Sequence, residues 1–512
     1  MSINNLINNS IQTMSSRAAC LIVSIVFLLS NFIFYPVVFE QNDDVIMKLI
    51  ANGYFTGQAE SHLVFINIIA GSILKFLYTY IPRIEWYAVM QIGLIITVFF
   101  SNLYCIIKYE TNAKRLILTL INLSLIYFLS RLQFSYVSGF LAISAVISQF
   151  YGLTNDNKKL LAFSVVLMLL SSLIRFEMFF FTYPILFITF LFKIKKVLSV
   201  KVAVIGGVLI IGAFLINQFS YKNNPDWKNY QDYNKARGTV TNNLNLNLDD
   251  KNLIQTLKLN DEDRFLLSNY IFTENLTTEK LKKLASYSKE SHVSIEKSVV
   301  SIYSYVTAYS IVIIAFLLVS LITRRFTVAI AILLHIIMIL ITVRFSNMVQ
   351  YRILYPTLFC LLFLYLQSLK TDESKSLSVF LTASLSIFVL IQVRDIKKNT
   401  FFNIRAQNNI REIEMQLPKN KAYLVDPTSN YFLIGRSAFE NPERKFVFFG
   451  WLTNFPTNKK TYPDYNSNLY RMAEHPLIIS NMNYNKLKSF IFNKTIYTIQ
   501  EKNIVVPTVK TQ

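Results

Sequence analysis

The stretch RAACLIVSIVFLLSNFIFYPVVFEQNDD, residues 17–44, joins a long apolar run to a group of acidic side chains. Its apolar part, Arg17 to Phe39, is longer than the about 20 residues that an α-helix needs to cross the hydrocarbon core of a bilayer. Residues 1–16 are polar and uncharged, which favours a first membrane helix or an uncleaved signal anchor over a cleaved signal peptide. Glu40, Asp43 and Asp44 follow, so the sequence predicts carboxylates at a membrane surface.

The composition of the whole chain agrees with a membrane protein. Of its 512 residues, 53% are hydrophobic and 16% are charged, whereas a soluble domain carries about 25% charged residues. This apolar content excludes intrinsic disorder, and 3 cysteines, each inside an apolar run, exclude a disulfide-stapled secreted domain. The formal charge of +21 comes from basic residues that largely flank apolar runs, as in a membrane protein. The composition therefore predicts a polytopic α-helical membrane protein.

Further apolar runs recur along the chain, near 63–81, 86–107, 116–131, 134–151, 160–174, 178–192, 202–219, 304–323, 326–343, 353–368 and 376–393. The run 63–81 contains Asn67 and Lys75, and a lysine in mid-membrane costs about 2.5–3.5 kcal/mol. If this run crosses, the basic loops that follow face outwards, against the positive-inside rule. If it lies along the outer surface, they all face the cytoplasm. We therefore expect about eleven crossings, with 63–81 as a juxtamembrane or re-entrant helix.

This topology divides the chain into four regions. They are an N-terminal membrane region (1–219) with an outer loop (40–62), an insert outside the membrane (220–302), a second membrane region (303–393) and a soluble domain (394–512). The loop, the insert and the C-terminal block then share the outer face of the membrane, and we call them the three polar blocks.

Local patterns suggest structure within the polar blocks. In the insert, Asn223–Gly238 has the composition of a turn, and helices are predicted to begin near Asn260 and Thr277, both suitable N-cap residues. In the C-terminal block, Ala422–Val425 and Phe446–Phe449 have the composition of strands. We expect a helical insert and a small mixed α/β domain.

The acidic pair Asp43 and Asp44 is the first candidate for chemistry. One reading is structural, because Asn42 or Asp43 could cap the next helix and early acids suit its dipole. The other is a general base that takes a proton from an acceptor hydroxyl. A third acidic ligand is not evident and the four histidines are scattered, so we expect no cofactor.

Arginines at the outward ends of apolar runs are the second candidate: Arg131, Arg175, Arg344 and Arg352. Charges near membrane depth are costly, so they indicate function, and guanidinium grips phosphate through two parallel hydrogen bonds. The alternative is that each one extends to the interface or pairs with a neighbour.

Four further residues are candidates for substrate contact: Glu40, His62, Glu177 and Arg237. Glu40 and His62 are the first and last residues of the outer loop, and Glu177 follows Arg175 by two positions. Arg237 lies near Trp227 and two tyrosines. These aromatic residues could stack on a sugar, but such a cluster is more often the core of a small subdomain.

The layout resembles the GT-C class of membrane glycosyltransferases. The matching residues are QNDD (41–44), the stretch HLVFINIIAGSILKFLYTYIP (62–82), and the order of helical bundle and outer C-terminal domain. In length and outline the chain is similar to bacterial serotype-converting O-antigen glucosyltransferases of the Gtr type. The resemblance implies inverting transfer of a hexose, glucose, from undecaprenyl phosphate to O-antigen at the periplasmic face of the inner membrane. It also implies a base at Asp43 or Asp44, a partner flippase and a donor synthase, and a divalent metal at the acidic pair in some members, which the residues here do not support.

Three other functions remain open. A polysaccharide polymerase would suit the large insert and outer arginines, but it gives no reason for acids directly after the first helix. A lipid-linked oligosaccharide flippase or other transporter would place charges in a central cavity. An interaction protein would use the outer blocks for docking.

Overall fold

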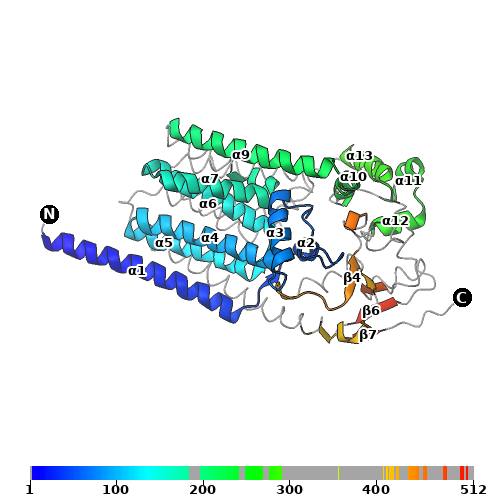
Figure 1. The fold of residues 1–512 in the computed structure, drawn as a ribbon, viewed down its shortest axis with the longest axis horizontal. Helices are drawn as coiled ribbons and strands as arrows, with labels where there is room; N and C mark the ends of the chain where they lie inside the picture. Colours follow the sequence, from blue (N-terminus) through cyan, green and yellow to red (C-terminus); the bar gives the residue numbers. More distant parts are fainter. Residues whose placement is uncertain are drawn as a thin grey trace.

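A computed structural model describes residues 3–180, 182–183, 197–241, 248–268, 272, 276–290, 356, 408, 411–412, 414–419, 422–425, 436–448, 452, 454–457, 477–480, 496–500 and 503–505. The predicted spans between 303 and 393, most of the span 178–192, and the candidates Arg344 and Arg352 lie outside the described residues. In the described part, long helices run alongside one another, and shorter helices and strands gather at one end of them (Figure 1).

The first helix, α1, spans Ile3–Phe34. It begins earlier and ends sooner than the predicted Arg17–Phe39. Its end has a local cause, because Pro36 disfavours the helical conformation of the residue before it. The chain beyond the proline is extended, and Val38–Phe39 form strand β1. The acidic loop therefore starts from a strand rather than from the end of a helix.

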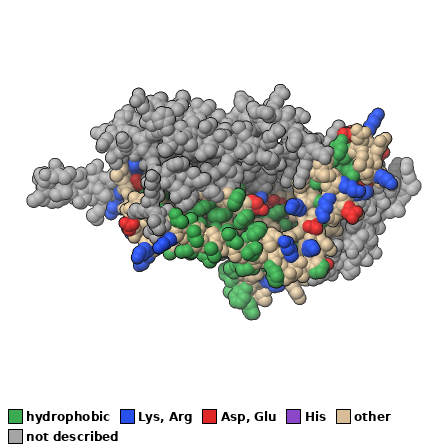
Figure 2. All heavy atoms as spheres, turned by 90° about the horizontal axis from the view of Figure 1, so that it is seen from above, with side chains coloured by type: hydrophobic (Ala, Val, Ile, Leu, Met, Phe, Trp, Pro, Cys, Tyr) green, Lys and Arg blue, Asp and Glu red, His purple; other side chains and the backbone are tan. Residues whose placement is uncertain are grey.

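Four helices are long and apolar enough to cross a membrane among the residues described. They are Ser16–Phe34 within α1, α4 (Trp86–Tyr109), α6 (Phe134–Thr154) and Val200–Lys222 within α9 (Val197–Lys222). Figure 2 shows apolar side chains over the middle of one face, with charged side chains towards its ends. This distribution suits a helical bundle that sits in a bilayer.

Two predicted spans are shorter than expected. In place of a continuous helix over 116–131, α5 (Asn112–Leu123) ends and a 3-10 helix, η1 (Ser124–Leu129), follows. Helix α7 (Lys158–Ile174) has 17 residues, which corresponds to about 25 Å. Both pack against longer neighbours: α5 against α1 and α4, and α7 against α6 and α9.

Helix α3 (Ile68–Tyr80) forms inside the predicted juxtamembrane stretch and lies across the ends of the long helices (Figure 1). Its 13 residues span about 20 Å, less than the ~30 Å core of a bilayer. Asn67 caps it by accepting the Ile69 N–H at 3.0 Å. A Cβ on Gly71 would lie 1.9 Å from the carbonyl oxygen of Ser61, so only glycine allows the loop to pack this closely on α3.

The insert is helical from its beginning, with α10 (Pro225–Thr241), α11 (Lys251–Leu257), α12 (Asp261–Ser268) and α13 (Thr278–Glu290). The turn predicted for Asn223–Gly238 is wrong. Asn224 accepts the Asp226 N–H at 3.0 Å and Pro225 occupies the first helical position, where proline is favoured. The predicted starts of α12 and α13 agree with the structure: Asn260 and Thr277 accept backbone N–H groups there.

The C-terminal block contributes a five-stranded sheet with the order β4-β3-β5-β6-β7. Its strands are β3 (Ala422–Val425), β4 (Lys445–Phe448), β5 (Leu477–Ser480), β6 (Ile496–Gln500) and β7 (Asn503–Val505). All neighbouring pairs are parallel except β6 and β7. The two predicted strands match β3 and, within one residue, β4.

Candidate functional site

The acidic pair lies in the first turn of α2 (Asn42–Ala51). Strand β1 pairs in parallel with β2 (Arg131–Leu132), and the Glu40 N–H donates to the Leu132 oxygen at 2.9 Å. This pairing places the start of α2 beside the start of α6. The N-cap is Gln41, and its side chain makes no capping hydrogen bond. The predicted capping role of Asn42 or Asp43 is therefore wrong, although the acids do occupy the first turn.

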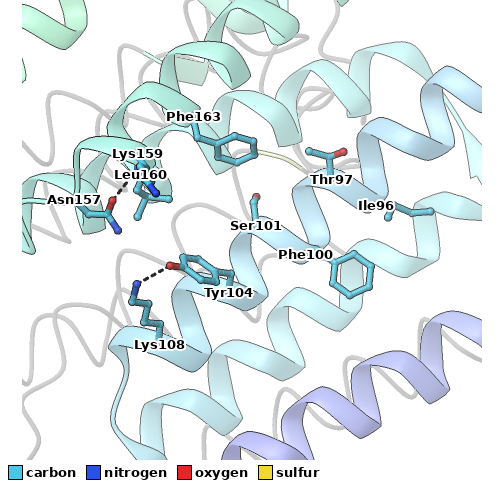
Figure 3. A pocket seen from close by; sticks show the side chains of 10 residues that line it. All are labelled: Ile96, Thr97, Phe100, Ser101, Tyr104, Lys108, Asn157, Lys159, Leu160 and Phe163. Carbon is cyan, nitrogen blue, oxygen red and sulfur yellow. Dashed lines mark hydrogen bonds between the residues drawn. The ribbon is translucent and has the colours of Figure 1, made fainter.

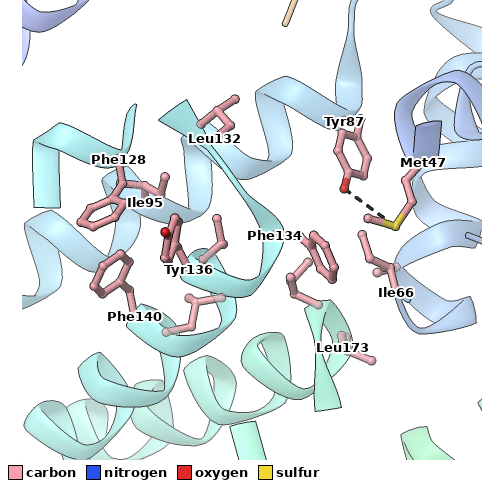
Figure 4. Close-up of a cluster of buried hydrophobic side chains, with 14 of the residues drawn as sticks. Met47, Ile66, Tyr87, Ile95, Phe128, Leu132, Phe134, Tyr136, Phe140 and Leu173 are labelled. Carbon is pink, nitrogen blue, oxygen red and sulfur yellow. Dashed lines mark hydrogen bonds between the residues drawn. The ribbon is translucent and has the colours of Figure 1, made fainter. Parts of the chain in front are cut away.

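Asp44 is fully buried, with 0% of its surface exposed. Its Oδ1 accepts three hydrogen bonds, from the Tyr87 hydroxyl at 3.0 Å, the Gln91 amide at 2.7 Å and the Phe134 N–H at 3.1 Å. Its Oδ2 is buried without a hydrogen-bond partner. Burial raises the pKa of Asp44 to about 7, although the three donors lower it. Figure 4 shows the side chains of two of these donor residues, Tyr87 and Phe134, within an apolar cluster.

Asp43 is half-buried and lies on the more open side of α2. Its charge acts on two neighbours: it raises the pKa of Asp44 and also that of Arg237. Burial of Arg237 has the opposite and larger effect, so the pKa of Arg237 is lowered overall. Asp43 is therefore a partly exposed acid with a cationic neighbour in the insert.

Arg131 lies in β2, in register with Val38 of β1. Its guanidinium donates to the Tyr127 hydroxyl at 3.2 Å. Burial alone would lower the pKa of Arg131, but Glu40 and Tyr127 raise it above its usual value. The structure thus places two predicted site residues, Glu40 and Arg131, as an electrostatic pair beside α2.

Arg175 follows the last residue of α7 and extends to the start of α6. Its guanidinium lies 4.9 Å above the Phe134 ring and donates to the Ser135 hydroxyl at 2.5 Å. Phe134 is also the residue whose N–H donates to Asp44. Asp44 and Arg175 therefore contact the backbone and the ring of the same phenylalanine. Glu177 lies 3.7 Å from Arg175, and its side chain is 78% exposed. This weak surface pair leaves Arg175 available for an anion.

Arg237 lies on α10 and donates to the Asn234 amide oxygen through Nε and Nη2, at 3.0 and 2.9 Å. Its guanidinium lies over the Phe272 ring. The nearby Trp227 and Tyr230 are buried and both pack on Phe455, so these aromatic residues join the insert to the C-terminal block. Their predicted alternative role, stacking on a sugar, does not suit this burial.

His62 joins the three polar blocks. Its Nδ1 lies 2.9 Å from Glu60 and its Nε2 lies 3.1 Å from the hydroxyl of Ser220 on α9. Its ring stacks on Trp227 of the insert, with 4.5 Å between centroids, and Trp227 packs on Phe455 of the C-terminal block. Burial would raise the pKa of Glu60, but hydrogen bonds from His62 and Ser61 hold it at about 2.

The order Glu60, His62, Ser220 is also that of a hydrolytic triad. An acyl-transfer site needs free backbone N–H groups for the developing oxyanion. Ser220 lies within α9, where the neighbouring N–H groups are bound within the helix. We therefore interpret this line of hydrogen bonds as a tether between loop and helix.

Sequence reasoning missed Lys48, one turn after Asp44 on α2. Only 1% of its surface is exposed, and its amine donates to the Glu440 carbonyl at 2.6 Å. Burial lowers its pKa to about 8, although Glu85 and Glu440 raise it. The i, i+4 spacing from Asp44 was the available signal, because such residues share a helix face.

The chemistry of this site follows from its charges. A half-exposed carboxylate with arginines nearby can accept a proton from a hydroxyl while the cations stabilise an anionic leaving group. Within the described ranges, no group of three histidine, cysteine or acidic residues is placed to hold a metal ion.

Comparisons of the chain with protein-family models, curated proteins and solved structures give no match.

Proposed function

We propose that this protein is a membrane glycosyltransferase that moves a hexose from a polyprenyl-phosphate carrier to a polysaccharide acceptor. The observation that carries the proposal is the meeting of carboxylates and cations at the start of α2. Asp44 and Arg175 contact the same residue, Phe134, and Asp43 acts electrostatically on Arg237. A polyprenyl-phosphate sugar needs both a base for its acceptor and cations for its phosphate.

The two aspartates have different roles in this proposal. Asp43 is the general base, because its carboxylate is half-exposed and a base must come within hydrogen-bond reach of the hydroxyl. Asp44 is a positioning residue, because its Oδ1 binds α4 through Tyr87 and Gln91 and binds the start of α6 through Phe134. The resemblance leaves the base at either aspartate, and this proposal assigns it to Asp43.

The reaction is a single inverting displacement at the anomeric carbon. Asp43 takes the proton of the acceptor hydroxyl, whose oxygen forms the new bond to the anomeric carbon. The bond from that carbon to the phosphate oxygen breaks, and the polyprenyl phosphate leaves with the electron pair. Arg131 and Arg175 stabilise the leaving phosphate, and Arg344 and Arg352 are proposed to join them. Glu40, His62, Glu177 and Arg237 are proposed to border the substrate.

The proposed setting is the periplasmic face of a bacterial inner membrane, with glucose as the hexose and O-antigen as the acceptor. Contacts among the polar blocks support a shared face: the Lys48 amine donates to the Glu440 carbonyl at 2.6 Å, and Trp227 packs on Phe455. About eleven crossings, a partner flippase and a donor synthase belong to the same proposal.

The test is transfer of labelled hexose from a polyprenyl-phosphate donor by purified protein and its variants. We expect Asp43→Asn to lower the rate by about 10²–10⁴-fold, the usual contribution of a general base. Asp44→Asn keeps the Oδ1 acceptor, so it should keep transfer within about tenfold. Asp226→Asn, a change of an exposed acid in the first turn of α10, is the control.

The opposite order of effects would move the base to Asp44, and full activity in both variants would remove the acidic pair from catalysis. Vesicle assays separate the remaining functions. A flippase would move the lipid-linked sugar across the bilayer without forming a glycosidic bond. A polymerase would join lipid-linked oligosaccharides instead of transferring one sugar.

A further inference from the structure

A groove of about 750 Å³ lies between α4 and α7 (Figure 3), and neither residue of the acidic pair lines it. Its α4 side is formed by residues at four-residue spacing, Ile96, Phe100, Tyr104 and Lys108, which share one face of the helix. From Ile96 to Lys108 the helix rises by 12 steps, about 18 Å along the axis. One leaflet of the hydrocarbon core is about 15 Å deep, so the groove runs about one leaflet deep.

The polarity of the groove changes along its length. One end is lined by the apolar side chains of Ile96, Phe100 and Phe163. The other end carries two cations, Lys108 in the last turn of α4 and Lys159 in the first turn of α7. The groove therefore complements an amphiphile: its apolar end can hold a hydrocarbon tail and its positively charged end can bind a headgroup.

Contacts around Lys108 hold its ammonium at the groove. Its Nζ donates to the Tyr104 hydroxyl at 2.7 Å and lies 5.1 and 5.3 Å from the centres of the Tyr104 and Tyr109 rings. The Asn157 amide in turn donates to the Tyr109 hydroxyl at 3.0 Å. An ammonium fixed in this way loses less conformational freedom when it binds an anion.

We infer that this groove binds one phospholipid with an anionic phosphate headgroup, its acyl chain along α4 and its phosphate between Lys108 and Lys159. The two lysines indicate that the occupant is anionic. A neutral apolar molecule would contact the apolar end only and would make no charged contact with Lys108 or Lys159. The start of α7 adds a partial positive charge at the same place. The inference is independent of the proposed glycosyl transfer, because the groove shares no residue with that site.

The experiment compares phosphatidylglycerol with phosphatidylcholine by native mass spectrometry of the purified protein. We expect phosphatidylglycerol to be retained preferentially. Replacing both Lys108 and Lys159 with alanine should lower its retention by about fivefold for each lysine. Lys158→Ala is the matched control, because Lys158 is exposed and does not line the groove. An equal loss in the control would mean diffuse surface attraction and would overturn the inference.

Two further variants test the groove itself. Thr97→Trp fills it while keeping both lysines, and it should lower retention as much as the double change does. Unchanged retention would place the lipid elsewhere. Phe100→Trp places a fluorophore at the tail, so brominated phosphatidylglycerol should quench it more strongly than brominated phosphatidylcholine. Equal quenching would also overturn the inference, even if the lysine variants fail to fold.

Discussion

Replacing Asp44 with asparagine should change how the stability of the protein depends on pH. The pKa of Asp44 rises from 3.8 to about 7 on folding, so the folded protein binds a proton that the unfolded chain has lost. A raised pKa contributes stability that is fully present below pH 3.8 and is lost as the pH rises through about 7. Asparagine does not titrate, so the variant lacks this dependence.

The size of the effect follows from the shift. A pKa difference of about three between the folded and unfolded states corresponds to about 4 kcal/mol of the free energy of unfolding in total. Between pH 5 and pH 6.5 the free energy of unfolding of the wild type should fall by about 2 kcal/mol relative to the variant. An amide in place of the carboxyl keeps the acceptor for Tyr87, Gln91 and Phe134, and any cost of its buried amino group is independent of pH.

Melting followed by tryptophan fluorescence in detergent can measure this difference, with Asp226→Asn as the control variant. Other groups titrate in the same range, but they cancel when two variants are compared at each pH. We expect the Tm of the wild type minus that of Asp44→Asn to fall by a few degrees from pH 5 to pH 6.5. A constant gap would show that Asp44 does not titrate there and would refute its assignment as a buried, mostly neutral carboxyl at acidic pH.

Two further stability predictions use the same melting assay. Gly71→Ala should lower Tm, because its Cβ would lie 1.9 Å from the Ser61 oxygen and one of the two backbones must move; an unchanged Tm would mean that the loop rearranges freely. Arg436→Met should destabilise the protein by about 3–5 kcal/mol, because it would leave the charge of Glu414 buried without its partner. In the wild type, Glu414 Oε2 lies 2.6 Å from Arg436 Nη2, and the Glu414 side chain is 3% exposed. Replacing both residues with apolar ones should restore most of the loss, and a double variant no better than the single one would contradict this reasoning.

Much of the local structure was predictable because its causes are local. Asn260 and Thr277 were expected to begin helices, and both accept backbone N–H groups at the starts of α12 and α13. The strands β3 and β4 form at short segments that contain β-branched and aromatic residues. The failure at α10 was also local: Asn224 and Pro225 were interpreted as turn residues, although the same pair is favoured at a helix start.

The candidate site was predictable in its residues but not in their roles. Position after the first helix indicated Asp43 and Asp44, yet it gave no means of separating them. The donors that do so, Gln91 and the Phe134 N–H, lie 47 and 90 residues away. Lys48 was missed because its partner, the Glu440 carbonyl, is 392 positions distant.

Hydrophobicity and charge along the chain, by themselves, determined that this protein is helical and rich in apolar helices, since the free energy of burying a side chain depends on its own chemistry. Which aspartate is buried, which arginine contacts Phe134 beside it and which segment of the C-terminal block binds α2 were decided only by the tertiary structure. Desolvation, hydrogen bonding and the pKa of a carboxyl depend on neighbours within a few ångströms, and the chain brings those neighbours together from segments that no local pattern connects.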